Sequence, residues 1–93
     1  IESFLETVGP NILSLRKAIA ANDKETIAFL SHKLKGSFRF IGCMEPGGIM
    51  EQIETYNQQE DLRPINELLE EATRQYDHIK RELQQALSEL KSV

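Results

Sequence analysis

The segment "SHKLKGSFRFIG", residues 31–42, carries the side chains of this chain that are best suited to chemistry. His32 offers a nitrogen lone pair when its imidazole is neutral, and Lys35 follows it one helical turn later. Gly36 comes next, although glycine costs a helix about 1 kcal/mol relative to alanine. Residues 26–44 contain three basic side chains and no acidic one, in a protein of net charge −4. A positive patch around an imidazole suits an anionic substrate, and the glycine indicates close approach by another molecule.

The apolar residues of this segment predict which way His32 points. At about 100° per residue they fall opposite His32 on a helical wheel; they are Ile27, Leu30, Leu34, Phe38 and Ile41. The arc around His32 carries a mixed set instead, namely Glu25, Ala28, Phe29, Lys35, Gly36, Arg39 and Cys43. Ala28 and Phe29 place apolar surface beside the imidazole, as a docking face for a partner requires. We therefore expect His32 to be exposed and not part of the core.

Other chemistries fit this sequence less well. A metal site needs three or four converging ligands, and the non-carboxylate candidates are His32, His78 and Cys43. Cys43 lies about 16 Å from His32 along a helix axis, so we expect no bound metal. Nucleotide-binding and phosphate-binding motifs are absent from the sequence, as is a nucleophile elbow. The remaining role is His32 itself as a nucleophile that accepts a phosphoryl group. His78 and Cys43 are interpreted as surface or boundary residues, and Met44 and Met50 as core residues.

Helical periodicity runs through nearly the whole chain, without competing strand alternation. It predicts four amphipathic helices, whose apolar stripes run from Phe4 to Ile19, from Ile27 to Ile41, from Ile49 to Tyr56, and over most of residues 62–91. Pro10 should kink or restart the first helix, Asn22 should cap the second with Glu25 in its first turn, and Gly42 should end it. The short connections predict an all-α, antiparallel up-down-up-down four-helix bundle, with the last helix projecting past the others.

Length and composition limit the class of protein. Ninety-three residues are enough for one small core. The chain has no apolar run of about 18 residues that would span a membrane, and its net negative charge argues against a nucleic-acid binder. Because the chain begins with Ile1 rather than methionine, we expect a single domain, residues 1–93, excised from the C-terminal end of a longer protein.

The run "HKLKGS", with Gly42 ten residues after His32, resembles the signature of histidine-containing phosphotransfer (HPt) domains. These domains are the phosphorelay modules of hybrid two-component sensor histidine kinases. The stretch "AIAANDKETIAFLSHKLKGS" is similar to the family's helical approach to its histidine, and "CMEPGGIMEQIE" is similar to its next helix. The resemblance therefore covers most of the chain and implies the same four-helix fold.

The resemblance also implies roles for particular residues. His32 would accept a phosphoryl group through Nε2 from a receiver-domain aspartyl phosphate and pass it to the aspartate of a response regulator. Lys35 would stabilise the phosphoryl oxygens as a point charge. Glu54, on the following helix, would orient the imidazole. The residues expected to meet the receiver are Ala28, Phe29, Lys33, Gly36 and Arg39.

Partners and location follow from the same resemblance. We expect this domain to bind no cofactor, because the magnesium that phosphoryl transfer needs would come from the receiver. Without an ATP-binding or kinase motif, the domain alone would be a phosphoryl carrier, although its parent chain would be a hybrid kinase. We expect a cytoplasmic monomer without direct membrane contact, tethered to an inner-membrane kinase where the parent is one. The alternative is a non-catalytic helical adaptor that binds partners through residues 28–43.

Overall fold

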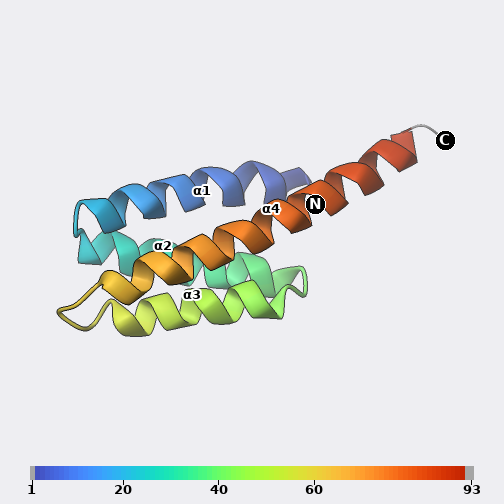
Figure 1. Cartoon of the computed structure of the whole chain (residues 1–93). Coiled ribbons are helices and arrows are strands. Elements are labelled where there is room, and N and C mark those ends of the chain that lie inside the picture. The colour runs from blue at the N-terminus through green and yellow to red at the C-terminus, as the bar shows by residue number, and fades with distance from the viewer. Residues whose placement is uncertain (1, 92–93) are drawn as a thin grey trace.

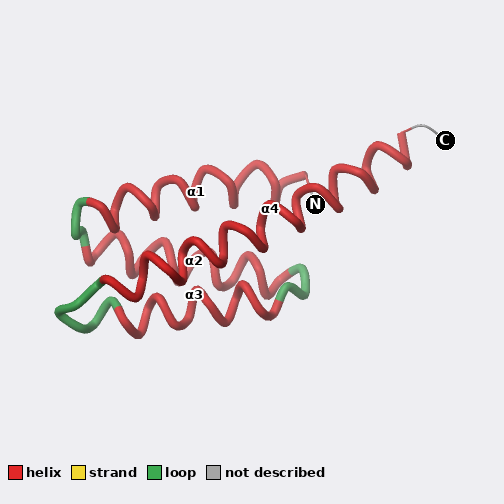
Figure 2. The backbone as a smooth tube through the Cα atoms, viewed as in Figure 1, coloured by secondary structure: helices red, strands yellow, loops and turns green. Residues whose placement is uncertain are grey.

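The computed structural model describes residues 2–91 and consists of helices joined by short connections (Figure 1). The helices are α1 (Glu2–Ala20), α2 (Lys24–Phe40), α3 (Met44–Tyr56) and α4 (Arg63–Lys91). Figure 2 shows the same path as a tube, with loops at the three connections. No strand occurs within the described residues. The prediction of an all-α chain with four helices is confirmed.

Successive helices run in opposite directions, and each packs against its neighbours in the sequence. Helices α1 and α4 also touch, which closes the ring of four. Helix α4 is the longest, and its C-terminal part projects beyond the other three (Figure 1), so the molecule measures 52 Å along its long axis against 21 and 18 Å across. The predicted antiparallel bundle and the projecting last helix are both confirmed.

The α1–α2 and α2–α3 turns are built alike. Each contains one residue in the left-handed region, Asn22 with φ of 54° in the first turn and Gly42 with φ of 83° in the second. In both turns the amide of the following residue donates to the carbonyl five residues earlier, at 2.9 Å. This pattern is a Schellman motif, which ends one helix and lets the next begin at once. Gly42 ends α2, as the sequence predicted.

Two details of the sequence prediction are corrected. Helix α1 does not restart at Pro10 but continues through it, because Pro10 and Glu6 lie on the exposed side, where a carbonyl that loses its amide partner faces water. The N-cap of α2 is Asp23 and not Asn22. The Asp23 side chain accepts a hydrogen bond from the Thr26 amide at 3.2 Å, and its hydrogen bonds with Thr26 lower the pKa of its carboxyl. Asn22 instead takes the left-handed position that ends α1.

Phe38, in the last turn of α2, is fully buried. Its ring meets Phe4 of α1 edge to face, with centroids 5.7 Å apart. Phe4 in turn lies 6.2 Å from the ring of Tyr76 on α4. Three helices therefore share one aromatic cluster, and burial of each such side chain contributes about 1.5–3 kcal/mol. The cluster fixes how α2 is rotated about its own axis and hence which of its side chains face outward.

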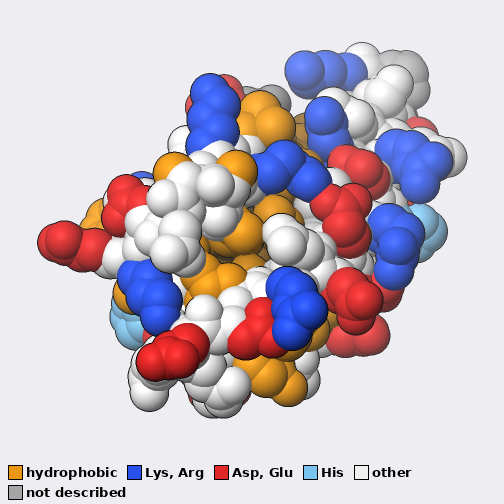
Figure 3. Space-filling model, turned by 60° about the vertical axis from the view of Figure 1, so that its left-hand side comes forward, with side chains coloured by type: hydrophobic (Ala, Val, Ile, Leu, Met, Phe, Trp, Pro, Cys, Tyr) orange, Lys and Arg blue, Asp and Glu red, His pale blue; other side chains and the backbone are white. Residues whose placement is uncertain are grey.

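The surface of the bundle is mixed in character. In the view of Figure 3, hydrophobic side chains show in the middle of the face and charged side chains of both signs surround them. None of the helices within residues 2–91 combines the length and the apolar character needed to cross a membrane.

Replacing Phe38 with alanine should lower the free energy of unfolding by about 3–5 kcal/mol, because the substitution leaves a cavity in the shared cluster. Phe40 lies on the same helix but is 90% exposed. Phe40→Ala should therefore change stability by less than about 0.5 kcal/mol. Denaturant unfolding followed by circular dichroism measures both variants, and equal losses would contradict the proposed core.

Candidate functional site

His32 projects from the middle of α2 into solvent, with a side chain that is 73% exposed. Leu34, two residues further on, is fully buried. The inward side of α2 consists of Ile27, Leu30, Ser31, Leu34 and Phe38. The orientation predicted for His32 is thus confirmed. Ser31 was not expected in the core, and its hydroxyl is satisfied by donating to the Ile27 carbonyl at 2.7 Å.

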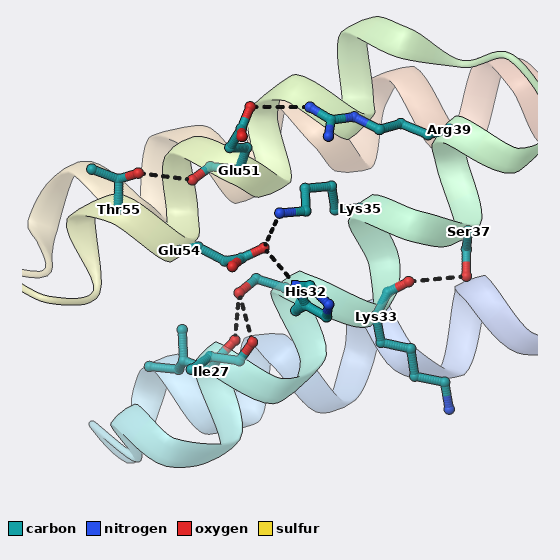
Figure 4. A network of polar contacts seen from close by, with 11 residues as sticks. Ile27, His32, Lys33, Lys35, Ser37, Arg39, Glu51, Glu54 and Thr55 are labelled. Atoms are coloured by element: carbon teal, nitrogen blue, oxygen red, sulfur yellow. Dashed lines mark hydrogen bonds and ion pairs between the residues drawn. The ribbon is translucent and has the colours of Figure 1, made fainter.

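Glu54 of α3 reaches across to α2 and lies beside both His32 and Lys35 (Figure 4). Its Oε1 atom is 3.6 Å from His32 Nδ1 and 3.0 Å from Lys35 Nζ. This oxygen is buried and accepts no hydrogen bond of good geometry from the described residues. Its charge is therefore balanced chiefly by the lysine ammonium, whose attraction depends little on angle. Since Nδ1 faces Glu54, Nε2 lies on the side of the ring away from the carboxylate.

Lys35 does not share the exposure of His32. The helical wheel placed both on one arc, yet the Lys35 side chain is only 18% exposed. The wheel shows the angle between two side chains but not which neighbouring helix covers each flank. Helix α3 lies along the flank that carries Lys35. Helix α1 lies along the opposite flank, toward which Phe29 and Lys33 are displaced on the wheel.

A second ion pair lies along the same seam between α2 and α3. Arg39 Nη2 is 3.0 Å from Glu51 Oε2. The stem of Arg39 crosses the start of α3 at Gly47, where a Cβ atom would come within 2.9 Å of Arg39 Cγ. Lys33 points away from this seam (Figure 4) and has no acidic partner within residues 2–91. The positive patch expected from residues 26–44 is therefore partly neutralised by acids from α3.

The register of α2 against α3 places Glu54 level with His32. His32 precedes Gly42 by ten residues and Glu54 follows it by twelve, so the two lie at similar distances from the turn. At the end of the two helices that lies opposite the Gly42 turn, Asn57 Nδ2 donates to the Lys24 carbonyl at 2.8 Å. The two helices are thus tied at both ends, and the Glu54 contact is a consequence of that register.

A groove of about 410 Å³ opens between α1 and α2 on the other flank of α2. Its lining is largely apolar and consists of Phe4, Thr7, Val8, Gly36, Ser37, Phe40 and Ile41. At Gly36 no atom lies within 4 Å of the place that a Cβ would take. Phe40 borders the groove with 90% of its surface exposed. Phe40 and the α1 residues were not among the individual site residues expected from the sequence, although an aromatic residue outside the apolar stripe was a signal for Phe40.

The remaining candidates lie apart from His32. Cys43 is the N-cap residue of α3, and partial burial raises the pKa of its thiol. His78 on α4 pairs with Glu82, at 3.0 Å from Nε2 to Oε1. Met50 is buried as predicted, but Met44 is 64% exposed, because it begins α3 next to the turn. Within residues 2–91, no three His, Cys, Asp or Glu side chains are grouped so that they could hold a metal ion.

Comparison with known proteins identifies the class to which this fold and site belong. A family model described as the Hpt domain matches residues 1–93, which is the whole chain. The comparisons with curated proteins and with solved structures found no match to this chain. The chain belongs to the Hpt domain family, whose members are phosphotransfer modules of two-component signalling and interact with receiver domains in phosphorelays.

Replacing Glu54 with alanine should change the tautomer of neutral His32. A carboxylate next to Nδ1 favours the proton on that nitrogen, and its removal lets the proton distribute over both nitrogens. Long-range ¹H–¹⁵N NMR spectra of the imidazole report the two populations. Glu51→Ala is the matched control, since Glu51 is on the same helix but contacts Arg39. An imidazole spectrum that is the same in Glu54→Ala and in the unchanged protein would contradict this contact.

Proposed function

We propose that His32 is the phosphoryl acceptor of this Hpt domain. It would take the phosphoryl group from a receiver-domain aspartyl phosphate and pass it to the aspartate of a response regulator. The observation that carries the proposal is the exposed imidazole on α2 whose Nδ1 faces Glu54 at 3.6 Å. His78 offers a poorer alternative, because its Nε2 is already paired with Glu82.

The proposed transfer is an exchange of one bond to phosphorus for another. The Nε2 lone pair forms the N–P bond as the P–O bond to the receiver aspartate breaks, and the departing carboxylate keeps the bonding electrons. The proton on Nδ1 stays on the ring, next to Glu54. The second transfer repeats these steps in reverse with a different aspartate. We expect the receiver to supply the magnesium ion, since Glu51 and Glu54 are engaged in ion pairs here.

Lys35 is proposed to supply positive charge to the phosphoryl oxygens. It follows His32 by about one helical turn, so its ammonium lies on the same side of α2. A lysine ammonium is a compact charge on a flexible stem, which suits an anion that is present only part of the time. In the free domain this charge is engaged with Glu54 at 3.0 Å, so Lys35 has to move when His32 is phosphorylated.

The receiver is proposed to dock over the exposed face of α2 and the groove beside it. Phe29 is 65% exposed and Phe40 90% exposed, and Ala28 is also exposed. Gly36 lies between Phe29 and Phe40 in the sequence, and its missing side chain leaves room for the receiver to approach α2 closely. Buried aromatic side chains commonly contribute most to the affinity of such interfaces. The apolar surface therefore supports a protein partner.

Electrostatic steering of an acidic receiver is proposed to depend more on Lys33 than on Arg39. Lys33 points into solvent (Figure 4), whereas Arg39 is held by Glu51 at 3.0 Å. A charge that is already paired contributes less to the long-range field that speeds association. We also propose that the domain works as a cytoplasmic, monomeric module of a hybrid sensor kinase, as domains of this family with the same motif suggest.

Phosphorylation tests the role of His32 directly. The domain is incubated with a radiolabelled phospho-receiver, and protein-bound label that is acid-labile and base-stable is measured. We expect the label in the unchanged protein and in His78→Gln, and none in His32→Gln, because glutamine lacks the nucleophilic nitrogen. Label that persists in His32→Gln would refute the assignment. Receiver binding without any label in the unchanged protein would favour the adaptor alternative.

Gly36→Ala should separate folding from function. The methyl group meets no atom within 4 Å in the free domain, so helix propensity should stabilise the fold by about 1 kcal/mol and raise Tm by about 4–8 °C. The same methyl group should slow phosphoryl transfer about tenfold or more, because small misplacements of reacting groups are costly. Gly48→Ala is the control, since it also meets no atom but lies on α3. Equal transfer rates for Gly36→Ala and the unchanged domain would remove the clearance role.

A further inference from the structure

A single oxygen of Glu54 contacts both of the side chains that are proposed to handle the phosphoryl group. We infer that Glu54 competes with the phosphoryl group on His32 for the ammonium of Lys35. This competition favours transfer of the phosphoryl group from His32 to a receiver. The inference rests on the proposed function of His32 and assigns Glu54 a role beyond orienting the imidazole. Glu54 is a positioning residue in this account, because it acts on the phosphoryl group through Lys35.

The geometry leaves Glu54 dependent on Lys35. Oε1 lies 3.0 Å from Lys35 Nζ and is buried, with no hydrogen bond from another described residue. The contact with His32 Nδ1 is longer, at 3.6 Å. If Lys35 moves toward a phosphoryl group, a buried carboxylate oxygen loses its nearest cation. Leaving a buried charge without its partner is unfavourable, so this movement has an energetic cost.

The phosphoryl group creates a demand for the same cation. It adds a charge of about −1.5 to −2 and three strong acceptor oxygens. Within residues 2–91, neither of the other two cations of α2 near His32 is placed to replace Lys35, because Lys33 points away from the seam and Arg39 is held by Glu51 at 3.0 Å. The Lys35 ammonium is therefore the nearest cation for two anions, the Glu54 carboxylate and the phosphoryl group. Whichever anion it contacts, the phosphorylated state has a higher free energy than it would with a neutral side chain at position 54.

This competition suits a carrier that must release what it accepts. In the onward transfer an aspartate oxygen forms the new P–O bond, and the electrons of the N–P bond return to Nε2. Lys35 then regains Glu54, so the restored ion pair favours discharge toward the receiver. Removing the charge of Glu54 should leave Lys35 free for the phosphoryl group and make the domain retain it longer.

The test is the equilibrium distribution of label between the domain and any receiver that exchanges label with the unchanged protein. Glu54→Gln keeps the shape of the side chain and removes its charge. We expect it to shift label toward phosphohistidine by about tenfold, the scale of one charge contact at a partly buried site. Glu51→Gln removes the same charge from the same helix, but its partner is Arg39, so its shift should stay below about twofold by the same Coulomb argument.

A double-substitution cycle shows whether Glu54 acts through Lys35. In a Lys35→Ala background, Glu54→Gln should shift the distribution by less than about twofold, because the cation in dispute is absent. The same tenfold shift in that background would overturn the competition, since the carboxylate would then act on the phosphoryl group directly. Equal shifts for Glu54→Gln and Glu51→Gln would overturn it too. Far-ultraviolet circular dichroism establishes that each variant is folded.

The failure of this inference differs from the failure of the proposed function. If the unchanged protein takes no label on His32 from a phospho-receiver or from phosphoramidate, both are overturned. If His32 is labelled and Glu54→Gln distributes label as the unchanged protein does, only the competition for Lys35 is overturned. Labelled His32 together with the tenfold shift and its loss in Lys35→Ala supports both.

Discussion

The antiparallel packing of α2 against α3 is the constraint on which the site depends. A Schellman turn at Gly42 joins the two helices, and the hydrogen bond from Asn57 to the Lys24 carbonyl ties their far ends. Between these two points Glu54 is brought beside His32 and Lys35. A shift of one residue in this register would move Glu54 by about 1.5 Å along the seam and about 100° around its helix. The position of Glu54 beside His32 therefore depends on hydrogen bonds that lie far from the imidazole.

Helix α2 has to satisfy the core and the site at the same time. Its inward side includes Phe38, which joins α1 and α4 in one aromatic cluster, and that burial offsets the cost of Gly36 on the outward side. Because the core determines the rotation of α2, it also determines that His32 faces solvent. Even the buried Ser31 fits this division, since its hydroxyl bonds within α2 and makes no demand on the neighbouring helix.

Two of the three cations on the exposed side of α2 are held in ion pairs, so the site is not an open positive patch. Helix α2 supplies the cations Lys35 and Arg39, and α3 supplies the acids Glu54 and Glu51 that meet them. The exposed Arg39–Glu51 pair contributes little to stability, about 0–1 kcal/mol, so its value here is in the position that it gives the arginine. In the proposed function, a cation held beside the histidine by a carboxylate would be available to an incoming phosphoryl group only in exchange for that carboxylate. Lys35 would thus be shared between Glu54 and the phosphoryl group that the proposed carrier role places on His32.

The sequence by itself determined the helices, the bundle and the outward direction of His32, because apolar periodicity reports how each helix faces its own core. It also determined that α2 ends at Gly42, since a left-handed turn residue is a local preference. Only the tertiary structure decided that Lys35 is covered by α3, that acids from α3 meet the cations of α2, and that a groove opens beside Gly36. The physical reason is that periodicity is a property of one helix. Which neighbour covers each flank depends on how the helices are arranged around the core, and residues far apart in the chain meet only there.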